Sequence, residues 1–255
     1  MSTVATAGRA FVGRSLRHSV RDVEVLVMAV SLPVMLMLVF TYVFGGAITG
    51  EPATYAAYVT PGTVLLCAGF GAASTSVGVA TDLAGGMVDR LRRMPVPAWT
   101  VLVGHVVASL VRNLVATAIV LGVGVLLGYR PDAGVLGWIG AVAVISVWVL
   151  AVTAVFAVIG LVAGSPEAAN GYGFAVLFLP YVSSAFVPVA TLPTWLQGVG
   201  EHQPVTPVIE SVRALLDGAY PGADLWWAMA WSVGLLGAAL VLAAVMFPRR
   251  RSRRS

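Results

Sequence analysis

The chain has 255 residues, of which 59% are hydrophobic and 10% are charged. Soluble proteins carry about 25% charged residues, so this composition excludes an ordinary soluble domain. The formal net charge is +4, and all fifteen basic residues are arginines. A Walker-type phosphate loop needs a lysine, so the chain is not an ATPase of that kind. The single cysteine and three scattered histidines indicate neither a disulfide framework nor a metal site; they are Cys67, His18, His105 and His202.

The first predicted element is a helix over residues 4–22. On a helical wheel Val12, Leu16 and Val20 lie on one side, and Arg14 and Arg17 lie on another. This pattern is typical of an amphipathic helix in the inner headgroup layer of a membrane, and the alternative is a basic leader without structure. The apolar stretch that follows has about 20 residues, more than the 7–15 of a signal peptide, so we expect it to be retained as an anchor.

Six apolar stretches are long enough to cross a membrane, which takes about 20 residues in a helix. We therefore predict an all-α membrane protein that forms a single transmembrane domain over 1–255. An even number of crossings places both termini on one side. The predicted spans are residues 25–44, 59–81, 101–128, 135–163, 168–189 and 225–247.

The arginines predict which side that is. Twelve of the fifteen lie before the first span, between the second and third spans, or in the basic tail 248–255. Arg130 and Arg213 lie on the opposite side, and Arg112 lies within a span. Cytoplasmic loops carry the excess of Lys and Arg, so we expect cytoplasmic termini and a plasma-membrane location. The tail is expected to bind anionic lipid rather than nucleic acid.

The predicted cytoplasmic loop 82–99 contains a short helix. Gly85 and Gly86 end the preceding span, and prolines follow from position 95 onward. Between them, Met87, Leu91 and Met94 share one side of two helical turns, an arrangement suited to docking in a groove of a cytosolic partner. The alternative is that these side chains rest on lipid. The eight residues are Met87, Val88, Asp89, Arg90, Leu91, Arg92, Arg93 and Met94.

The outward segment 190–222 is too polar to span a membrane and too apolar for a free loop. Pro193, followed by Trp195 and Leu196, predicts one short helix. A second is predicted after Pro207, ending before Gly218. We expect both to dip into the outer interface as re-entrant helices, covered by protein. Glu210 and Arg213, three residues apart, are expected to pair.

Few polar residues are expected at membrane depth. Gly, Ala and Ser in the second span predict close helix packing, or alternatively the wall of a substrate path. Arg112, with Asn113 beside it, either anchors the third span or contacts lipid by snorkelling, or acts on a substrate. We find no nucleophile motif, paired carboxylates or proton relay in the spans, which predicts that the chain has no catalytic site, no metal and no cofactor of its own, and that its energy source is another chain.

Two sets of motifs carry a resemblance to a known family. The outward set is Phe186-Val-Pro, Leu192-Pro-Thr-Trp195, Gln203-Pro-Val-Thr-Pro207 and Arg213-Ala-Leu-Leu-Asp-Gly218. The inner set is Gly86-Met-Val-Asp-Arg-Leu-Arg-Arg-Met-Pro95, Arg112-Asn113 and Leu127-Gly128-Tyr129-Arg130-Pro131. Over nearly its whole length the chain resembles the membrane subunits of ABC exporters of the ABC-2 type, in particular the daunorubicin-resistance-like permeases. It departs from them at His105, where a basic residue is more usual.

The resemblance implies a permease worked by a separate ATP-binding-cassette ATPase, which holds the ATP and Mg. It implies that 87–94 form a coupling helix and that two permease copies join two ATPases. It also implies export of a hydrophobic or amphipathic compound, drug-like or lipid, through an outer gate. The candidate gate residues are Trp195, Leu196, Pro204, Pro207, Glu210 and Arg213. Alternatives are an exporter of polysaccharide or other polar cargo, a channel or ion-coupled carrier outside the ABC class, a membrane enzyme and a non-transporting scaffold.

Overall fold

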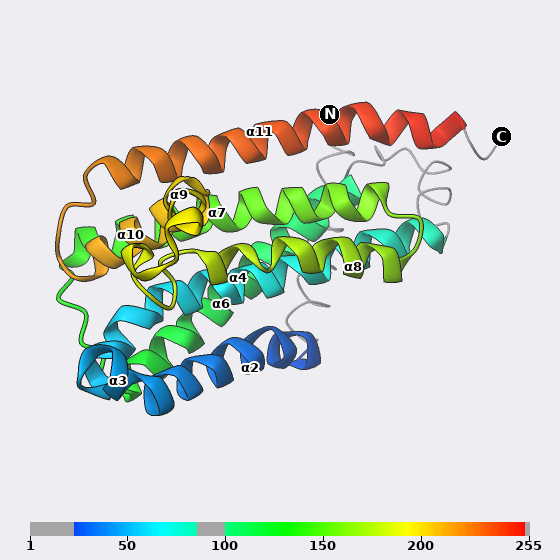
Figure 1. The fold of residues 1–255 in the computed structure, drawn as a ribbon. Coiled ribbons are helices and arrows are strands. Elements are labelled where there is room, and N and C mark those ends of the chain that lie inside the picture. Colours follow the sequence, from blue (N-terminus) through cyan, green and yellow to red (C-terminus); the bar gives the residue numbers. More distant parts are fainter. Residues whose placement is uncertain (1–22, 86–99, 253–255) are drawn as a thin grey trace.

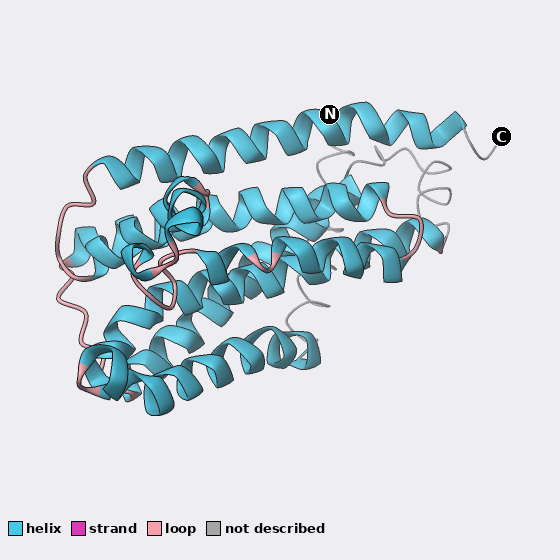
Figure 2. Cartoon of the chain, viewed as in Figure 1, coloured by secondary structure: helices cyan, strands magenta, loops and turns pink. Residues whose placement is uncertain are grey.

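The computed structural model describes residues 23–85 and 100–252. Within these ranges every regular element is a helix, as the sequence predicts (Figure 2). The predicted amphipathic helix 4–22 and the predicted coupling helix 87–94 lie outside the described residues, and so does the end of the basic tail from 253 onward.

Long helices run back and forth between two ends of a bundle (Figure 1). At the end that we call proximal, α2 (Val23–Val39) begins, α4 (Pro52–Ala84) ends and α6 (Thr100–Leu126) begins. At the opposite, distal end lie α3 (Gly45–Thr49) and the loop between α6 and α7 (Val135–Val162).

The last third of the chain contains the shorter elements. Helix α8 (Pro166–Val176) starts at the proximal end and runs back along α4 and α7 (Figure 1). The distal end then carries the short turns η2 (Leu179–Val182) and η3 (Val189–Thr191), followed by α9 (Thr194–His202) and α10 (Val205–Leu216). Finally α11 (Ala223–Ser252) returns to the proximal end and reaches into the stretch predicted as the tail.

Five stretches of the described residues are long and apolar enough to cross a membrane. They correspond to the first four predicted spans and the sixth, although the first includes the π-helical turn η1 (Phe40–Phe44) and extends to Thr49. The second is longer than predicted at both ends, since its helix starts at Pro52 instead of residue 59. The proline at the first position suits the start of a helix because that position needs no amide hydrogen.

Residues 168–189, the predicted fifth span with Pro180 inside it, do not form one continuous α-helix. Only α8, with 11 residues, is α-helical there, and the chain continues through turns and the short 3₁₀ helix η2. Pro180 contributes to the break, in a helix that has little packing around it. Its ring clashes with the carbonyl four residues before it and it has no amide hydrogen to offer, and α8 ends at that residue, Val176.

Helix α4 lies at the centre of the bundle and packs against α2, α6, α7, α8 and α10. Its small residues permit close approach, as the sequence predicted. At Gly160 of α7 an added Cβ atom would lie 2.3 Å from the Ser76 carbonyl oxygen of α4. The only cysteine, Cys67, is buried in this core, with its sulfur atom 3.3 Å from the Ala29 carbonyl oxygen of α2. The core thus depends on helix-to-helix packing around α4.

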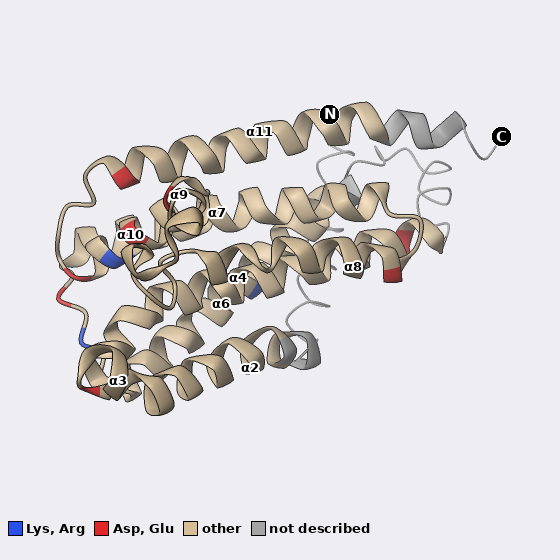
Figure 3. Cartoon of the chain, in the orientation of Figure 1, with Lys and Arg blue, Asp and Glu red and all other residues tan. Residues whose placement is uncertain are grey.

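Among the described residues, the charged ones gather at the two ends of the bundle, and most of its length is uncharged (Figure 3). Arg112, within α6, is an exception that lies away from both helix ends. This distribution fits a bundle whose middle faces hydrocarbon.

Candidate functional site

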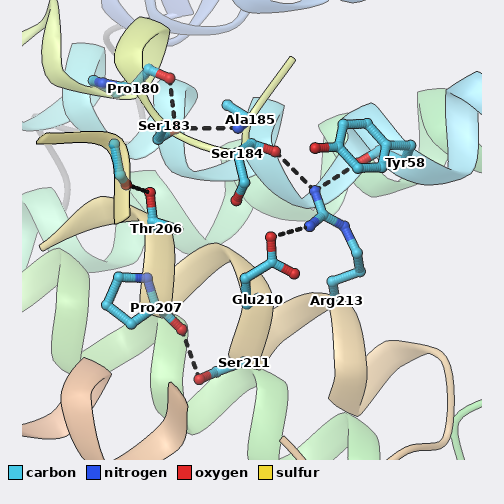
Figure 4. Close-up of polar contacts among 11 residues, drawn as sticks. Tyr58, Pro180, Ser183, Ser184, Ala185, Thr206, Pro207, Glu210, Ser211 and Arg213 are labelled. Atoms are coloured by element: carbon cyan, nitrogen blue, oxygen red, sulfur yellow. Dashed lines mark hydrogen bonds and ion pairs between the residues drawn. The ribbon is translucent and has the colours of Figure 1, made fainter. Parts of the chain in front are cut away.

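A branched polar cluster is centred on Arg213 of α10 (Val205–Leu216) at the distal end (Figure 4). Its guanidinium group donates to the Glu210 carboxylate over 2.6 Å, which confirms the predicted pairing. It also donates to the Tyr58 carbonyl oxygen over 3.1 Å and to the Ser184 carbonyl oxygen over 3.0 Å. The guanidinium carbon lies 4.2 Å from the centre of the Tyr58 ring, within the range of a cation–π contact.

Both carbonyl groups that Arg213 binds lie where the regular backbone is disturbed. Tyr58 lies in α4 three residues before Pro61, whose ring distorts the preceding turn of the helix. Ser184 lies in the irregular segment 177–188, just after η2. Arginine presents five donors in a rigid fork, so one side chain can serve two backbone positions and one carboxylate. Arg213 therefore joins α4, α10 and the irregular segment.

The irregular segment, residues 177–188, is held by side chains from other elements. Gln203 donates to the Leu179 carbonyl oxygen over 3.0 Å, and Tyr55 donates to the Phe186 carbonyl oxygen over 2.8 Å. A buried backbone acceptor without a partner costs free energy, so these donors replace the bonds that a continuous helix would have made.

Close packing holds the same segment against α4. A Cβ atom added to Gly62 would lie 2.5 Å from the α carbon of Ala185 and 2.6 Å from its carbonyl oxygen. Only glycine allows the backbone of α4 to approach the segment this closely. Gly62 lies within the predicted second span, but the sequence did not single it out, because its neighbour is 123 positions away in the sequence.

The six candidate gate residues do not form one contiguous cluster. Helix α9 (Thr194–His202) follows Pro193 as predicted, and its Trp195 is 77% exposed. Leu196 and Pro204 are half-buried, whereas Pro207 is buried within α10. Among the six, the structure joins only Glu210 and Arg213 by a polar contact. The two short helices of the predicted outward segment are present, and α10 packs on α7, α11 and α4.

A second tyrosine contact fixes the far end of α10. The Tyr129 hydroxyl group donates to the Asp217 carboxylate over 3.0 Å, linking the loop after α6 to the residue that follows α10. Burial of the Tyr129 side chain raises the pKa of its hydroxyl group, and the nearby negative charge of Asp217 raises it further. Tyr129 is therefore a neutral donor at physiological pH.

The two candidate residues in α6 face α4. Arg112 donates to the Ser74 hydroxyl oxygen over 2.8 Å and to the Gly71 carbonyl oxygen over 3.1 Å. Asn113 is buried beside Gly71, where an added Cβ atom would overlap the Asn113 amide group. These contacts place both side chains between two helices.

One contact at the proximal end was not anticipated. His105 of α6 and Asp82 of α4 form an ion pair over 2.8 Å if the imidazole is protonated, and a hydrogen bond otherwise. The two residues flank the stretch 86–99, which carries the candidate coupling residues and lies outside the described part of the chain. The sequence analysis noted His105 only as one of three scattered histidines and as a departure from the family. The signal for the pair was the acidic residue at one end of the loop and the histidine at the other.

Comparisons with known proteins identify the family. The model of the ABC-2 type transporter family matches residues 6–216, and the chain belongs to that family. Among relatives, it is 33% identical over 208 residues to a daunorubicin resistance ABC transporter permease protein of Streptomyces coeruleorubidus, covering 81% of this chain and 74% of the relative. It is 24% identical over 253 residues to probable doxorubicin resistance ABC transporter permease proteins from two strains of Mycobacterium tuberculosis, CDC 1551 / Oshkosh and ATCC 25618 / H37Rv, covering 95% of this chain and 91% of each relative.

Membership explains the apolar helices. The chain is a membrane protein of a transporter family, and its relatives are named as permeases. An ABC transporter of this type has an ATP-binding-cassette ATPase as partner, so the family implies such a partner here.

Proposed function

We propose that the chain is the membrane-spanning permease subunit of an ATP-driven exporter that moves a hydrophobic or amphipathic compound out of the cell. The observation that carries the proposal is the family match over residues 6–216, together with relatives named for resistance to two drugs. The bundle adds support, since its described middle is nearly free of charge and suits an apolar cargo (Figure 3).

In this proposal ATP and Mg bind to the partner ATPase, and Met87, Leu91 and Met94 make the apolar contact with it. Val88, Asp89 and the three arginines at 90, 92 and 93 surround that contact. The contact between Asp82 and His105 supports this role because it ties together the two helices that carry the loop. A push on the loop would then reach α4 and α6 together.

We further propose that the proximal end is cytoplasmic and that two copies of the chain act together in the plasma membrane. The arginine count supports the orientation, since positive charge is retained on the cytoplasmic side. The distal helices α9 and α10 would then form the outer gate, with Arg213 holding the irregular segment in its closed position. Arg112 would fix the distance between α4 and α6 through its bonds to Gly71 and Ser74.

The test uses the permease purified with its cognate ATPase and reconstituted in liposomes. The wild-type complex should accumulate daunorubicin in an ATP-dependent manner, and the permease alone should not. Leu91→Asp should abolish transport and substrate-stimulated ATP hydrolysis, because it places a charge in the proposed apolar contact. Membrane insertion should be unchanged.

Leu91→Met is the matched control, because it keeps an apolar side chain of similar volume and should retain transport. Unchanged stimulated hydrolysis in Leu91→Asp would contradict the coupling role. Flux through the permease alone, without ATP, would contradict the proposed function itself.

A further inference from the structure

The distal end of the first span contains a backbone irregularity that the proposed function does not use. Between α2 and α3 the chain forms the π-helical turn η1, residues Phe40–Phe44. In such a turn the amides bond to carbonyl groups five residues earlier instead of four, so the turn holds one residue more than an α-helical turn. Well under about 1% of residues adopt this form, and it recurs at functional sites. We therefore asked what η1 could do.

One side chain of η1 is buried, and its hydroxyl group lacks a hydrogen-bond partner among the described residues. This residue is Thr41, which is 1% exposed. In the regular helix α4, Thr60 and Thr63 donate to the carbonyl oxygens four residues earlier. An α-helical turn in place of η1 would offer Thr41 the same kind of bond, to the carbonyl oxygen of Met37. The buried hydroxyl group thus disfavours the π-helical form.

The π-helical turn also determines which residue of the chain lies against α4. Gly45 is buried there, and an added Cβ atom would lie 3.1 Å from the Cβ atom of Tyr55 and 3.3 Å from the α carbon of Pro52. An α-helical turn would advance the following chain by about 100°, the angle of one residue, and would bring Phe44 to the face that Gly45 occupies. A phenylalanine does not fit where an added Cβ atom is already tight, so α3 would move away from α4.

Two contacts would carry this movement to the irregular segment. The centroid of the Phe40 ring in η1 lies 4.9 Å from that of Phe186. Tyr55, against which Gly45 packs, donates its hydroxyl group to the Phe186 carbonyl oxygen over 2.8 Å. Phe186 is buried, so its neighbours determine its position. A shift of α3 would therefore disturb two of the contacts that hold the irregular segment.

We propose that η1 is a two-state hinge. Its π-helical form, the form in this structure, keeps the distal end closed, and its α-helical form releases α3 and the irregular segment during transport. The Thr41 hydroxyl group favours the α-helical form and the packing of Gly45 favours the π-helical form, so the two effects oppose each other. A partner can shift such an equilibrium by its differential affinity for the two states. This inference rests on the proposed function, because opening of the distal end is a step of export.

The first test removes the unpaired hydroxyl group. Thr41→Val keeps the shape of the side chain and should stabilise the π-helical form, because valine has no buried polar atom in its side chain. The unfolding midpoint of the permease in detergent should rise by about 2–4 °C. ATP-driven daunorubicin uptake by the permease–ATPase complex in liposomes should fall about fivefold or more.

Thr117→Val is the matched control for this test. Thr117 lies in the regular helix α6, where its hydroxyl group is also buried and without a partner among the described residues. Its replacement should raise the midpoint in the same way and leave uptake unchanged. Equal uptake by Thr41→Val and the wild type would overturn the proposal, and so would an equal fall in the two variants.

The second test shifts the equilibrium in the opposite direction. Gly45→Ala crowds α4 and should favour the α-helical form, whereas Gly46→Ala, where nothing lies within 4 Å, should favour neither. Nitroxide labels at Ile48→Cys on α3 and Val115→Cys on α6, both exposed, report the position of α3. In the wild-type complex, ATP and orthovanadate should add a second population of label distances.

Gly45→Ala should show that second population without nucleotide, and Gly46→Ala should not. A single distance distribution in the wild type with and without ATP and orthovanadate would overturn the hinge. The same two tests distinguish this inference from the proposed function. A wild-type complex that transports daunorubicin while the label distances stay constant refutes the hinge alone. A complex that hydrolyses ATP without transporting daunorubicin refutes the proposed function, and the label distances still decide whether η1 moves.

Discussion

Two prolines in the membrane-spanning part of the chain have opposite outcomes. Helix α4 continues through Pro61 and has 33 residues. Helix α8, by contrast, ends at Val176, four residues before Pro180. An interior proline costs a helix about 3 kcal/mol or more in both places. The difference must therefore come from the surroundings.

Helix α4 is packed on several sides, and most residues around Pro61 are buried. Near the proline, the Thr60 and Thr63 hydroxyl groups donate hydrogen bonds to the carbonyl oxygens of Ala56 and Val59, one turn earlier. Arg213 donates to the carbonyl oxygen of Tyr58. Helix α8 buries only Ala169 and Gly173. A proline is tolerated where packing holds the helix on both sides of it, and it ends a helix that lies at the edge of the bundle.

The strongest test of this comparison is Gly62→Ala, at the point where α4 touches the irregular segment. The new Cβ atom would have to displace the backbone at Ala185, and overpacking of this kind costs about 1–3 kcal/mol or more. We expect a marked fall in the thermal unfolding midpoint of the protein in detergent. Gly122→Ala in α6, where nothing lies within 4 Å, should be neutral or slightly stabilising. Equal midpoints for the two variants would show that the segment can move away from α4 without cost.

The next largest effect is expected from Arg213→Ala, which removes the donors shared by α4 and the irregular segment. The side chain is 14% exposed and its partner Glu210 is 34% exposed, so we expect a loss of about 1–3 kcal/mol. Adding Glu210→Ala should recover part of that loss, because a lone carboxylate is no longer left behind. Arg130→Ala, at an exposed arginine of the neighbouring loop that donates to the Val125 and Tyr129 carbonyl oxygens, should cost less, about 0.5–1 kcal/mol. If Arg213→Ala is no worse than that control, the bridge does not hold the segment.

Pro180→Ala is expected to have the smallest effect on stability, within about 1 kcal/mol. It restores an amide hydrogen that can bond to the Val176 carbonyl, so α8 should lengthen. Hydrogen exchange of the amides over 177–182 should slow relative to the wild type. Pro188→Ala, just before η3, should leave that exchange unchanged. Unaltered exchange in Pro180→Ala would mean that α8 ends at Val176 because of the hydrogen bonds that Gln203, Tyr55 and Arg213 donate to the irregular segment, and not because of the proline.

Much of this fold could be predicted from hydrophobic length alone. Five of the six predicted spans coincide with long apolar helices, because a helix that crosses hydrocarbon must satisfy its own backbone. The break in the α-helix of the fifth predicted span could not be predicted, since Pro61 and Pro180 look alike in the sequence and differ only in what packs around them. The sequence did show Pro180 inside the stretch, but a proline alone does not decide the matter.

The candidate site divides in the same way. The pair of Glu210 and Arg213 was predictable because three positions on a helix bring side chains together. The contacts of Arg213 with Tyr58 and Ser184 join residues 155 and 29 positions apart, and no local pattern encodes them. The roles of residues 87–94 remain predictions, because they lie outside the described residues.

The burial of the Cys67 side chain has a practical consequence for labelling the protein. The chain has no other thiol, and this one is enclosed in the core between α4 and α2. A maleimide dye or a nitroxide spin label would therefore attach selectively to a cysteine placed by mutation on the surface, for example at Trp195 or Tyr220, with the native sulfur left in place. Pairs of such labels would report in real time how far the distal helices travel during a turnover.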